Sequence, residues 1–197
     1  DVLQEAVKKY ISEIKKIRPH GPYYLGGWSS GGVFAYEIAQ QLTQRGETVD
    51  ILIMFDTPYP LSYLSEEMAA EKIDKILGIH NITKDNIEYN DYFYEIQKNN
   101  QLMASYVPKP YEGKVVLIRA GKFDKALQDR KNEGQRYLWP DSIIPNLTQY
   151  VVNSTHLKMF EEQYVNLLIP ILTNELSKID SSEPIADIKY EKNKLEK

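Results

Sequence analysis

The sequence predicts an α/β fold in which a mostly parallel sheet is flanked by helices and interrupted by a helical insertion. Apolar runs that suit strands buried on both faces alternate along the chain with segments of helical periodicity. A glycine-flanked serine lies between the first predicted strand and the helix that follows it. Later in the chain, two helical segments follow one another without a strand between them. Alternating strands and helices are typical of an α/β fold.

Composition and charge exclude several function classes. The chain has 197 residues, of which 42% are hydrophobic, and a formal net charge of -4, which suits one domain with a sizeable core. Without a basic stripe, neither nucleic acid nor a membrane is expected as a partner. The absence of cysteine excludes a disulfide scaffold and a cysteine nucleophile. We expect a cytoplasmic domain, because no signal peptide or bilayer-spanning run is recognised. We also expect no metal site and no cofactor of its own.

The first half of the chain alternates helical and strand patterns. Apolar residues spaced three and four apart indicate the helices, and Gly46 stands where a helix C-terminal cap belongs. The predicted elements are a helix over 2–17, a strand over about 23–28, a helix running to Gln44, and a strand over 51–55.

Residues of about 61–106 form the predicted insertion. Helical patterns cover roughly 65–78 and 85–105. Because an insertion at the carboxyl edge of such a sheet lies over the active site, we expect it to act as a lid. The alternative is an ordinary helical crossover, but two helices where one would suffice favour the lid.

The last part of the chain completes the sheet. Predicted here are a strand over 114–119, a short helix near 123–131, a strand over 148–152 and a helix over roughly 161–178. Residues 1–179 are therefore expected to form one domain. Residues 180–197 are charged and lack periodicity, so a disordered tail is expected there.

A candidate nucleophile lies in the pentapeptide Gly27-Trp28-Ser29-Ser30-Gly31. A strand, a G-x-S-x-G motif and a helix in succession form the context of a nucleophile elbow, whose strained turn presents the serine. The glycines two before and two after the serine are expected to leave room for the neighbouring chain. The helix N-terminus favours negative charge that develops beside the serine. The alternative, an ordinary glycine-rich turn, does not account for the flanking strand and helix.

Histidine is the usual base for a serine nucleophile, because its pKa lies near working pH. The chain contains three. His20 precedes the strand of Ser29 and so belongs to the opposite end of the sheet, while His80 lies between the two insertion helices. His156 follows the last strand, at the same edge as Ser29. Topology therefore selects His156 as the candidate base.

The base needs a carboxylate to orient it. Asp56 directly follows the strand 51–55, whereas Asp124 lies a few residues beyond the strand 114–119. Both positions suit such a role, and spacing alone does not separate them. The immediate succession favours Asp56, although an aspartate before Thr57 and Pro58 is also an ordinary turn residue.

The residues around the motif resemble a known family. Residues 21–32 read GPYYLGGWSSGG, and the match continues through 35–42, 46–49 and 52–56. This pattern is similar to that of the type I thioesterase domains that end polyketide synthases and nonribosomal peptide synthetases. The resemblance is strong over about 20–60, moderate over 106–160 and weak in the insertion.

The resemblance implies an α/β-hydrolase fold and a substrate held on a carrier protein. An acyl or peptidyl chain, or a polyketide, would arrive as a thioester on the phosphopantetheine arm of an acyl carrier or peptidyl carrier protein. Ser29 would take the chain as an oxyester, and water or an internal nucleophile would release it. The family usually places its acid where Asp56 stands, while related editing thioesterases place it where Asp124 lies. The backbone N–H of Ser30 would be one oxyanion donor.

The chain departs from the family pattern at its start. In the family, additional strands precede the helix at 2–17, and a loop among them supplies the second oxyanion N–H. We therefore expect this chain to lack those strands and that donor. Two other functions stay open: a general serine esterase or lipase of the same fold, and a noncatalytic relative that serves as an interaction module.

Overall fold

The computed structural model describes residues 2–60, 66–79, 81–122 and 138–179. The helices and strands that were predicted within these residues are all present, with ends that differ from the predicted ones by a few residues. The elements are α1 (Val2–Ile17), β1 (Tyr23–Trp28), α2 (Ser30–Gln44), β2 (Val49–Phe55), α3 (Glu66–Ile79), α4 (Tyr89–Ser105), β3 (Val115–Ala120), β4 (Leu147–Val152) and α6 (Glu162–Ser177).

The four strands form one parallel sheet in the order β1-β2-β3-β4. Trp28 at the end of β1 pairs with Phe55 at the end of β2, which in turn pairs with Ile118 of β3. Because all four strands run the same way, their carboxyl ends meet at one edge. The predicted α/β class is confirmed.

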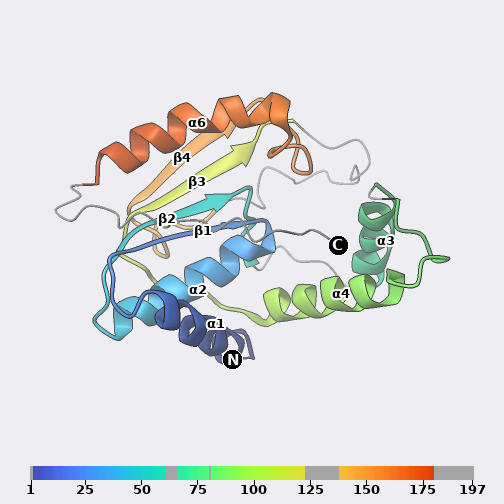
Figure 1. The fold of residues 1–197 in the computed structure, drawn as a ribbon, viewed down its shortest axis with the longest axis horizontal. Helices are drawn as coiled ribbons and strands as arrows, with labels where there is room; N and C mark the ends of the chain where they lie inside the picture. The colour runs from blue at the N-terminus through green and yellow to red at the C-terminus, as the bar shows by residue number, and fades with distance from the viewer. Residues whose placement is uncertain (1, 61–65, 80, 123–137, 180–197) are drawn as a thin grey trace, which may run out of the picture.

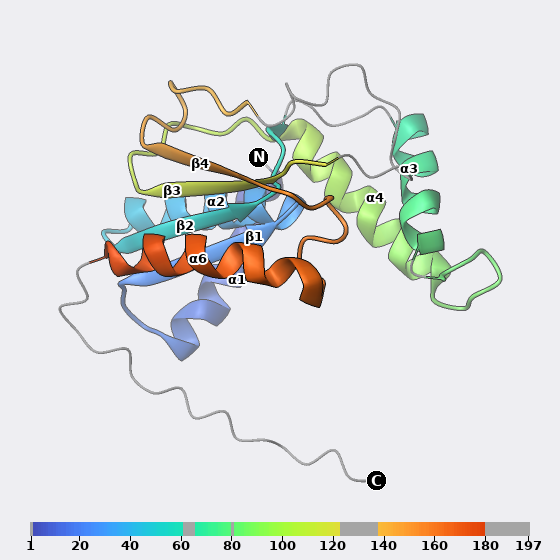
Figure 2. The same ribbon diagram turned by 90° about the horizontal axis from the view of Figure 1, so that it is seen from above.

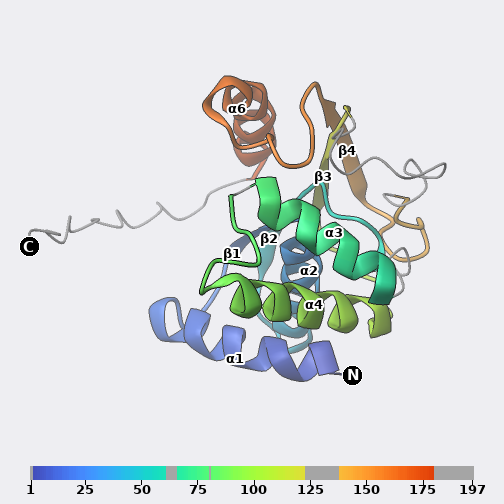
Figure 3. The ribbon, with the colours of Figure 1, turned by 90° about the vertical axis from the view of Figure 1, so that its right-hand side faces the viewer.

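Helices cover both faces of this sheet. In Figures 1 and 3, α1 and α2 lie on one side of the strands and α6 lies on the other. Residues of β2 alternate between the two layers: Leu52 and Met54 belong to the core shared with α1 and α2, while Ile51 and Ile53 belong to the core beneath α6. The continuous apolar run of β2 thus results from burial on both faces.

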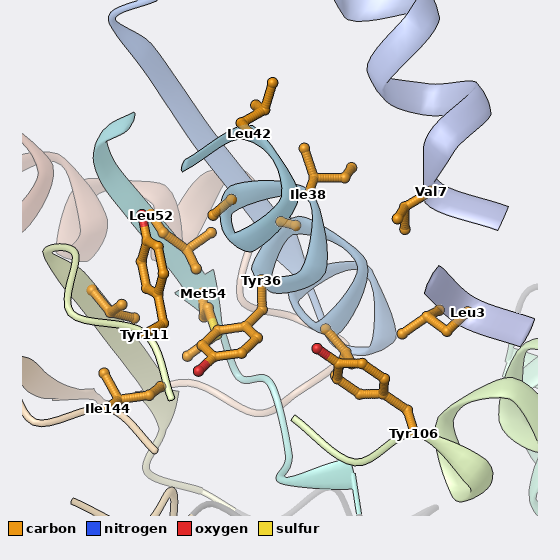
Figure 4. Close-up of a cluster of buried hydrophobic side chains, with 14 of the residues drawn as sticks. Leu3, Val7, Tyr36, Ile38, Leu42, Leu52, Met54, Tyr106, Tyr111 and Ile144 are labelled. Atoms are coloured by element: carbon orange, nitrogen blue, oxygen red, sulfur yellow. The ribbon is translucent and has the colours of Figure 1, made fainter. Parts of the chain in front are cut away.

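A buried polar network lies inside the larger core. Figure 4 shows Tyr36 and Tyr106 among apolar side chains of α1, α2 and β2, and neither tyrosine is exposed. The Tyr106 hydroxyl donates to Glu37 Oε2 at 2.7 Å, and Gln41 Nε2 donates to Glu37 Oε1 at 2.9 Å. Tyr106 directly follows α4. The network therefore ties the end of α4 to α2, the helix after the candidate serine.

The predicted insertion consists of α3 and α4, and residues 66–79 and 81–114 contain no strand. The two helices pack against each other through Ile73, Leu77 and Tyr89. In both Figure 1 and Figure 2 they lie beyond the carboxyl ends of the strands. The helical content of the insertion is confirmed, and its action as a lid stays a prediction.

Some predictions lie outside the described residues: the short helix near 123–131 and the disordered tail at 180–197. In the part of the chain that the structure describes, no helix combines the length and the apolar character needed to cross a bilayer.

Candidate active site

The serine of the G-x-S-x-G motif stands in a strained turn. Ser29 has φ 56° and ψ −128°, a conformation that side-chain-bearing residues seldom adopt. Its amide donates to the carbonyl of Phe55 at 2.8 Å, and its carbonyl accepts from the amide of Gly32 at 3.1 Å. These bonds tie Ser29 to the end of β2 and to the first turn of α2. The strained elbow that the motif predicts is present.

Two glycines make this tight turn possible. A Cβ on Gly27 would overlap the backbone of Gly31 and Gly32, and a Cβ on Gly32 would overlap the side chain of Thr57. At Gly31 an added Cβ would meet nothing within 4 Å. The expectation that room is needed at positions 27 and 31 is therefore wrong for the second glycine. The close approach occurs one residue later, where α2 crosses the segment that follows β2.

Asp56 occupies the equivalent place at the end of β2. Its φ is 45°, its amide donates to the carbonyl of Ile118 at 2.7 Å, and the residue is 1% exposed. The amide of Ala120 donates to Oδ1 at 2.9 Å. A buried carboxylate needs such donors. The strand β3 therefore holds one oxygen of Asp56 and leaves the other directed elsewhere.

That other oxygen meets His156. The distance from Asp56 Oδ2 to His156 Nδ1 is 2.7 Å, across 100 residues of sequence. An ionised carboxylate only accepts hydrogen bonds, so Nδ1 carries the proton and the lone pair of the neutral ring lies on Nε2. The loop of His156 is attached to the segment after β3, because the amide of Lys122 donates to the carbonyl of Ser154 at 2.9 Å.

An aromatic cluster surrounds the imidazole. The ring of Trp28, the residue before Ser29, stacks on the ring of His156 at a centroid distance of 4.9 Å and an interplanar angle of 26°. Phe160 packs edge-on against Trp28 and against Phe55, at 6.2 and 5.1 Å. Sequence reasoning missed this cluster, and the aromatic side chain next to the serine was the signal available for it.

The structure brings Asp56 and His156 into contact and places Ser29 at the same sheet edge, beside the indole that stacks on His156. His20 lies before β1, at the opposite end of the sheet, with Nδ1 3.6 Å from Glu47 Oε1. His80 and Asp124 lie outside the described residues.

Ser30 is the first residue of α2, so its N–H is among the amides that have no carbonyl acceptor within the helix. Such amides favour an anion.

Among the residues that the structure describes, no group of three or more histidine, aspartate or glutamate side chains is arranged to hold a metal ion.

Comparison with known proteins identifies the family. A model of the thioesterase domain matches residues 2–173. The chain belongs to the thioesterase domain family. Polyketide synthases are among its curated relatives, and its structural neighbours include the NocB thioesterase domain and a nonribosomal peptide synthetase.

The relatives are far longer than this domain. It is 55% identical over 58 residues to the non-reducing polyketide synthase pks27 of Aspergillus flavus. These 58 residues are 29% of this chain and 3% of that protein. It is 49% identical over 70 residues to Polyketide synthase 1 of Metarhizium brunneum, or 36% of this chain and 3% of that protein.

Solved structures show the same fold. The NocB thioesterase domain, in covalent complex with a fluorophosphonate nocardicin G analog, superposes with a TM-score of 0.76 and 29% identity, covering 88% of this chain and 75% of that one. A four-domain nonribosomal peptide synthetase, AB3403, superposes with a TM-score of 0.67 and 23% identity, covering 87% of this chain and 16% of that one. The predicted α/β-hydrolase fold is confirmed.

Proposed function

We propose that this thioesterase domain releases an acyl chain from the phosphopantetheine arm of a carrier protein, through an ester on Ser29. One observation carries the proposal. The 2.7 Å hydrogen bond between Asp56 and His156 lies at the sheet edge where Ser29 stands in a strained turn. Ser29 follows β1, Asp56 follows β2 and His156 lies in the loop after β4, so the residues proposed as nucleophile, acid and base lie at one edge of the sheet. A serine nucleophile needs such a base and an acid that orients it.

In the first half-reaction, the chain moves to the serine. The Ser29 hydroxyl gives its proton to His156 Nε2 while its oxygen bonds to the thioester carbonyl carbon. The resulting oxyanion accepts a hydrogen bond from the Ser30 N–H at the N-terminus of α2. The intermediate then collapses, the C–S bond breaks, and His156 returns the proton to the departing sulfur.

In the second half-reaction, the chain leaves the serine. Water, or a hydroxyl, amine or enol carbon of the chain itself, gives a proton to His156 Nε2 and attacks the ester carbonyl. When the C–O bond breaks, His156 protonates Ser29 again. Throughout, Asp56 keeps the Nδ1 proton in place and stabilises the imidazolium.

The relatives favour a polyketide as the chain. The two relatives with the identities given above are polyketide synthases, and the aligned stretches, 55% and 49% identical, cover 29% and 36% of this chain. We therefore propose an acyl carrier protein as partner and a polyketide thioester as substrate. The helices α3 and α4 would cover the bound chain from beyond the strand ends. A cytoplasmic location stays a prediction.

The substrate class is tested by a direct comparison. The domain is given an acyl chain on a phosphopantetheinylated carrier protein, the same chain on N-acetylcysteamine, and the same chain as a simple oxyester, and products are identified by mass spectrometry. We expect the highest kcat/KM with the carrier-bound chain and no release by Ser29→Ala. A preference for the simple ester would indicate an esterase instead. The products also distinguish a free acid from a cyclised chain.

A further inference from the structure

Trp28 has no role in the reaction steps described above. It ends β1, directly before Ser29, and is 38% exposed. A large aromatic side chain is costly to leave in water. Its indole stacks on the imidazole of His156, with ring centroids 4.9 Å apart and an interplanar angle of 26°.

We propose that Trp28 is a positioning residue that holds the catalytic imidazole of His156 in the orientation for proton transfer and favours its charged form. The inference rests on the proposed role of His156 as the base. It adds a contact on the face of the ring to the contact that Asp56 makes on its edge.

The two contacts restrain different motions of the ring. The bond from Nδ1 to Asp56 Oδ2 fixes one edge of the imidazole but still allows the ring to tilt about that bond. Stacking on Trp28 opposes this tilt, because the two planes are within 26° of each other. A stacked neighbour covers a face and not an edge, so the indole does not cover the in-plane lone pair of Nε2.

The indole face also affects the charge that develops on the ring. Proton transfer from Ser29 makes His156 an imidazolium. The face of an indole carries negative charge density and attracts a cation placed over it. This attraction acts when the ring is charged, and hence lowers the barrier to proton transfer while adding little to substrate binding.

Phe160 keeps the indole in place. It meets Trp28 at an interplanar angle of 89° and Phe55, the last residue of β2, at 65°. Trp28 is therefore restrained by a second aromatic ring that itself rests on the neighbouring strand. The orientation of the stacked pair is thus set by the packing at the ends of β1 and β2.

The first test observes the ring itself. The Nδ1 proton of His156 is followed by proton NMR of ¹⁵N-histidine-labelled protein, with His156→Gln to assign it. We expect a downfield resonance in the unsubstituted protein and in Trp28→Phe, which keeps an aromatic face. In Trp28→Leu the resonance should broaden or disappear, as the ring loses its hold on Asp56. Tyr24→Leu is the matched control, because Tyr24 is also in β1 and also 38% exposed.

The second test is kinetic, with acyl N-acetylcysteamine as substrate. We expect kcat to fall roughly three- to thirtyfold in Trp28→Leu, with KM within about twofold, and most of the loss to be recovered in Trp28→Phe. Unchanged kcat and an unchanged His156 resonance in a folded Trp28→Leu protein would overturn the inference. If the unsubstituted protein shows no turnover, the thioesterase proposal fails, and the NMR comparison alone decides whether Trp28 holds the imidazole.

Discussion

Single side-chain positions determine whether the turn at Ser29 can form. Gly32 lies against Thr57, whose side chain is buried, so neither partner has room to move away. Gly31, its neighbour in the same helical turn, has open space at the position of a Cβ.

Gly32→Ala should therefore destabilise the fold and Gly31→Ala should not. We expect a loss of about 1–3 kcal/mol for Gly32→Ala, the usual cost of overpacking. For Gly31→Ala we expect little change or a small gain from helix propensity. Urea unfolding of the two variants checks this. Equal stabilities would contradict the packing described at Gly32.

Asp56 should act through His156. In Asp56→Asn an amide replaces the carboxylate, so the group facing Nδ1 no longer requires a proton there. The wrong tautomer then places a proton on Nε2, and we expect kcat to fall roughly 10³–10⁴-fold with the fold retained. Steady-state kinetics and circular dichroism measure the two effects. Activity within tenfold of the unsubstituted protein would point to Asp124 or another group as the acid.

The motif and the strand order predicted Ser29, Asp56 and His156 at one sheet edge, because a parallel sheet presents the residues after its strands together. They did not by themselves separate Asp56 from Asp124 as the acid. They did not predict the stacking of Trp28, since contacts between side chains from distant strands leave no periodic signal. Which glycine is crowded was also beyond the motif, because it depends on where Thr57 passes α2.

At the scale of elements, α6 is attached to the sheet by a buried carboxylate. Glu175 is 1% exposed and accepts from Lys178 at 2.6 Å, from the hydroxyl of Tyr150 at 2.6 Å, and pairs with Lys114 at 3.0 Å. Hydrogen bonds from Lys178 first, and then from Tyr150, lower the pKa of Glu175 from 4.5 to about 2. The folded state therefore stabilises the ionised carboxylate of Glu175 relative to the protonated one.

This contact should make stability depend on pH. Because the pKa of Glu175 is lower in the folded state, its contribution is present above about pH 4.5 and is lost as pH falls toward 2. Glu175→Gln should cost about 1–3 kcal/mol at pH 7, and the difference should narrow between pH 5 and 3. Thermal unfolding across this range tests it, with exposed Glu162→Gln of the same helix as control. A constant difference would contradict the account.

The insertion is attached to the body by Tyr106. Its hydroxyl is fully buried and bonds to Glu37, and burial with the nearby Glu37 charge raises the pKa of Tyr106. Tyr106→Phe leaves Glu37 with one donor fewer, which should cost about 1–3 kcal/mol. It should also speed amide exchange in α4. Tyr94→Phe, an exposed position in α4, is the control. Exchange unchanged relative to Tyr94→Phe would show that this bond does not anchor the insertion.

Across the whole molecule, the alternation of apolar runs and helical patterns predicted each described strand and helix to within a few residues. Strands such as β2 were predictable because burial on both faces makes them uniformly apolar. The buried carboxylates Glu37 and Glu175 were not, because a glutamate in a helix ordinarily indicates its solvent face. Their partners come from other elements and are defined only by the folded structure.

The central claim is that Ser29 is a nucleophile activated by His156 and Asp56. Incubation with a fluorophosphonate, followed by digestion and mass spectrometry, tests it most directly, since the similar NocB domain is known in covalent complex with a fluorophosphonate compound. We expect an adduct on the peptide that contains Ser29, much slower labelling in His156→Gln, and none in Ser29→Ala. No adduct, or an adduct on another residue at the same rate in Ser29→Ala, would contradict the claim.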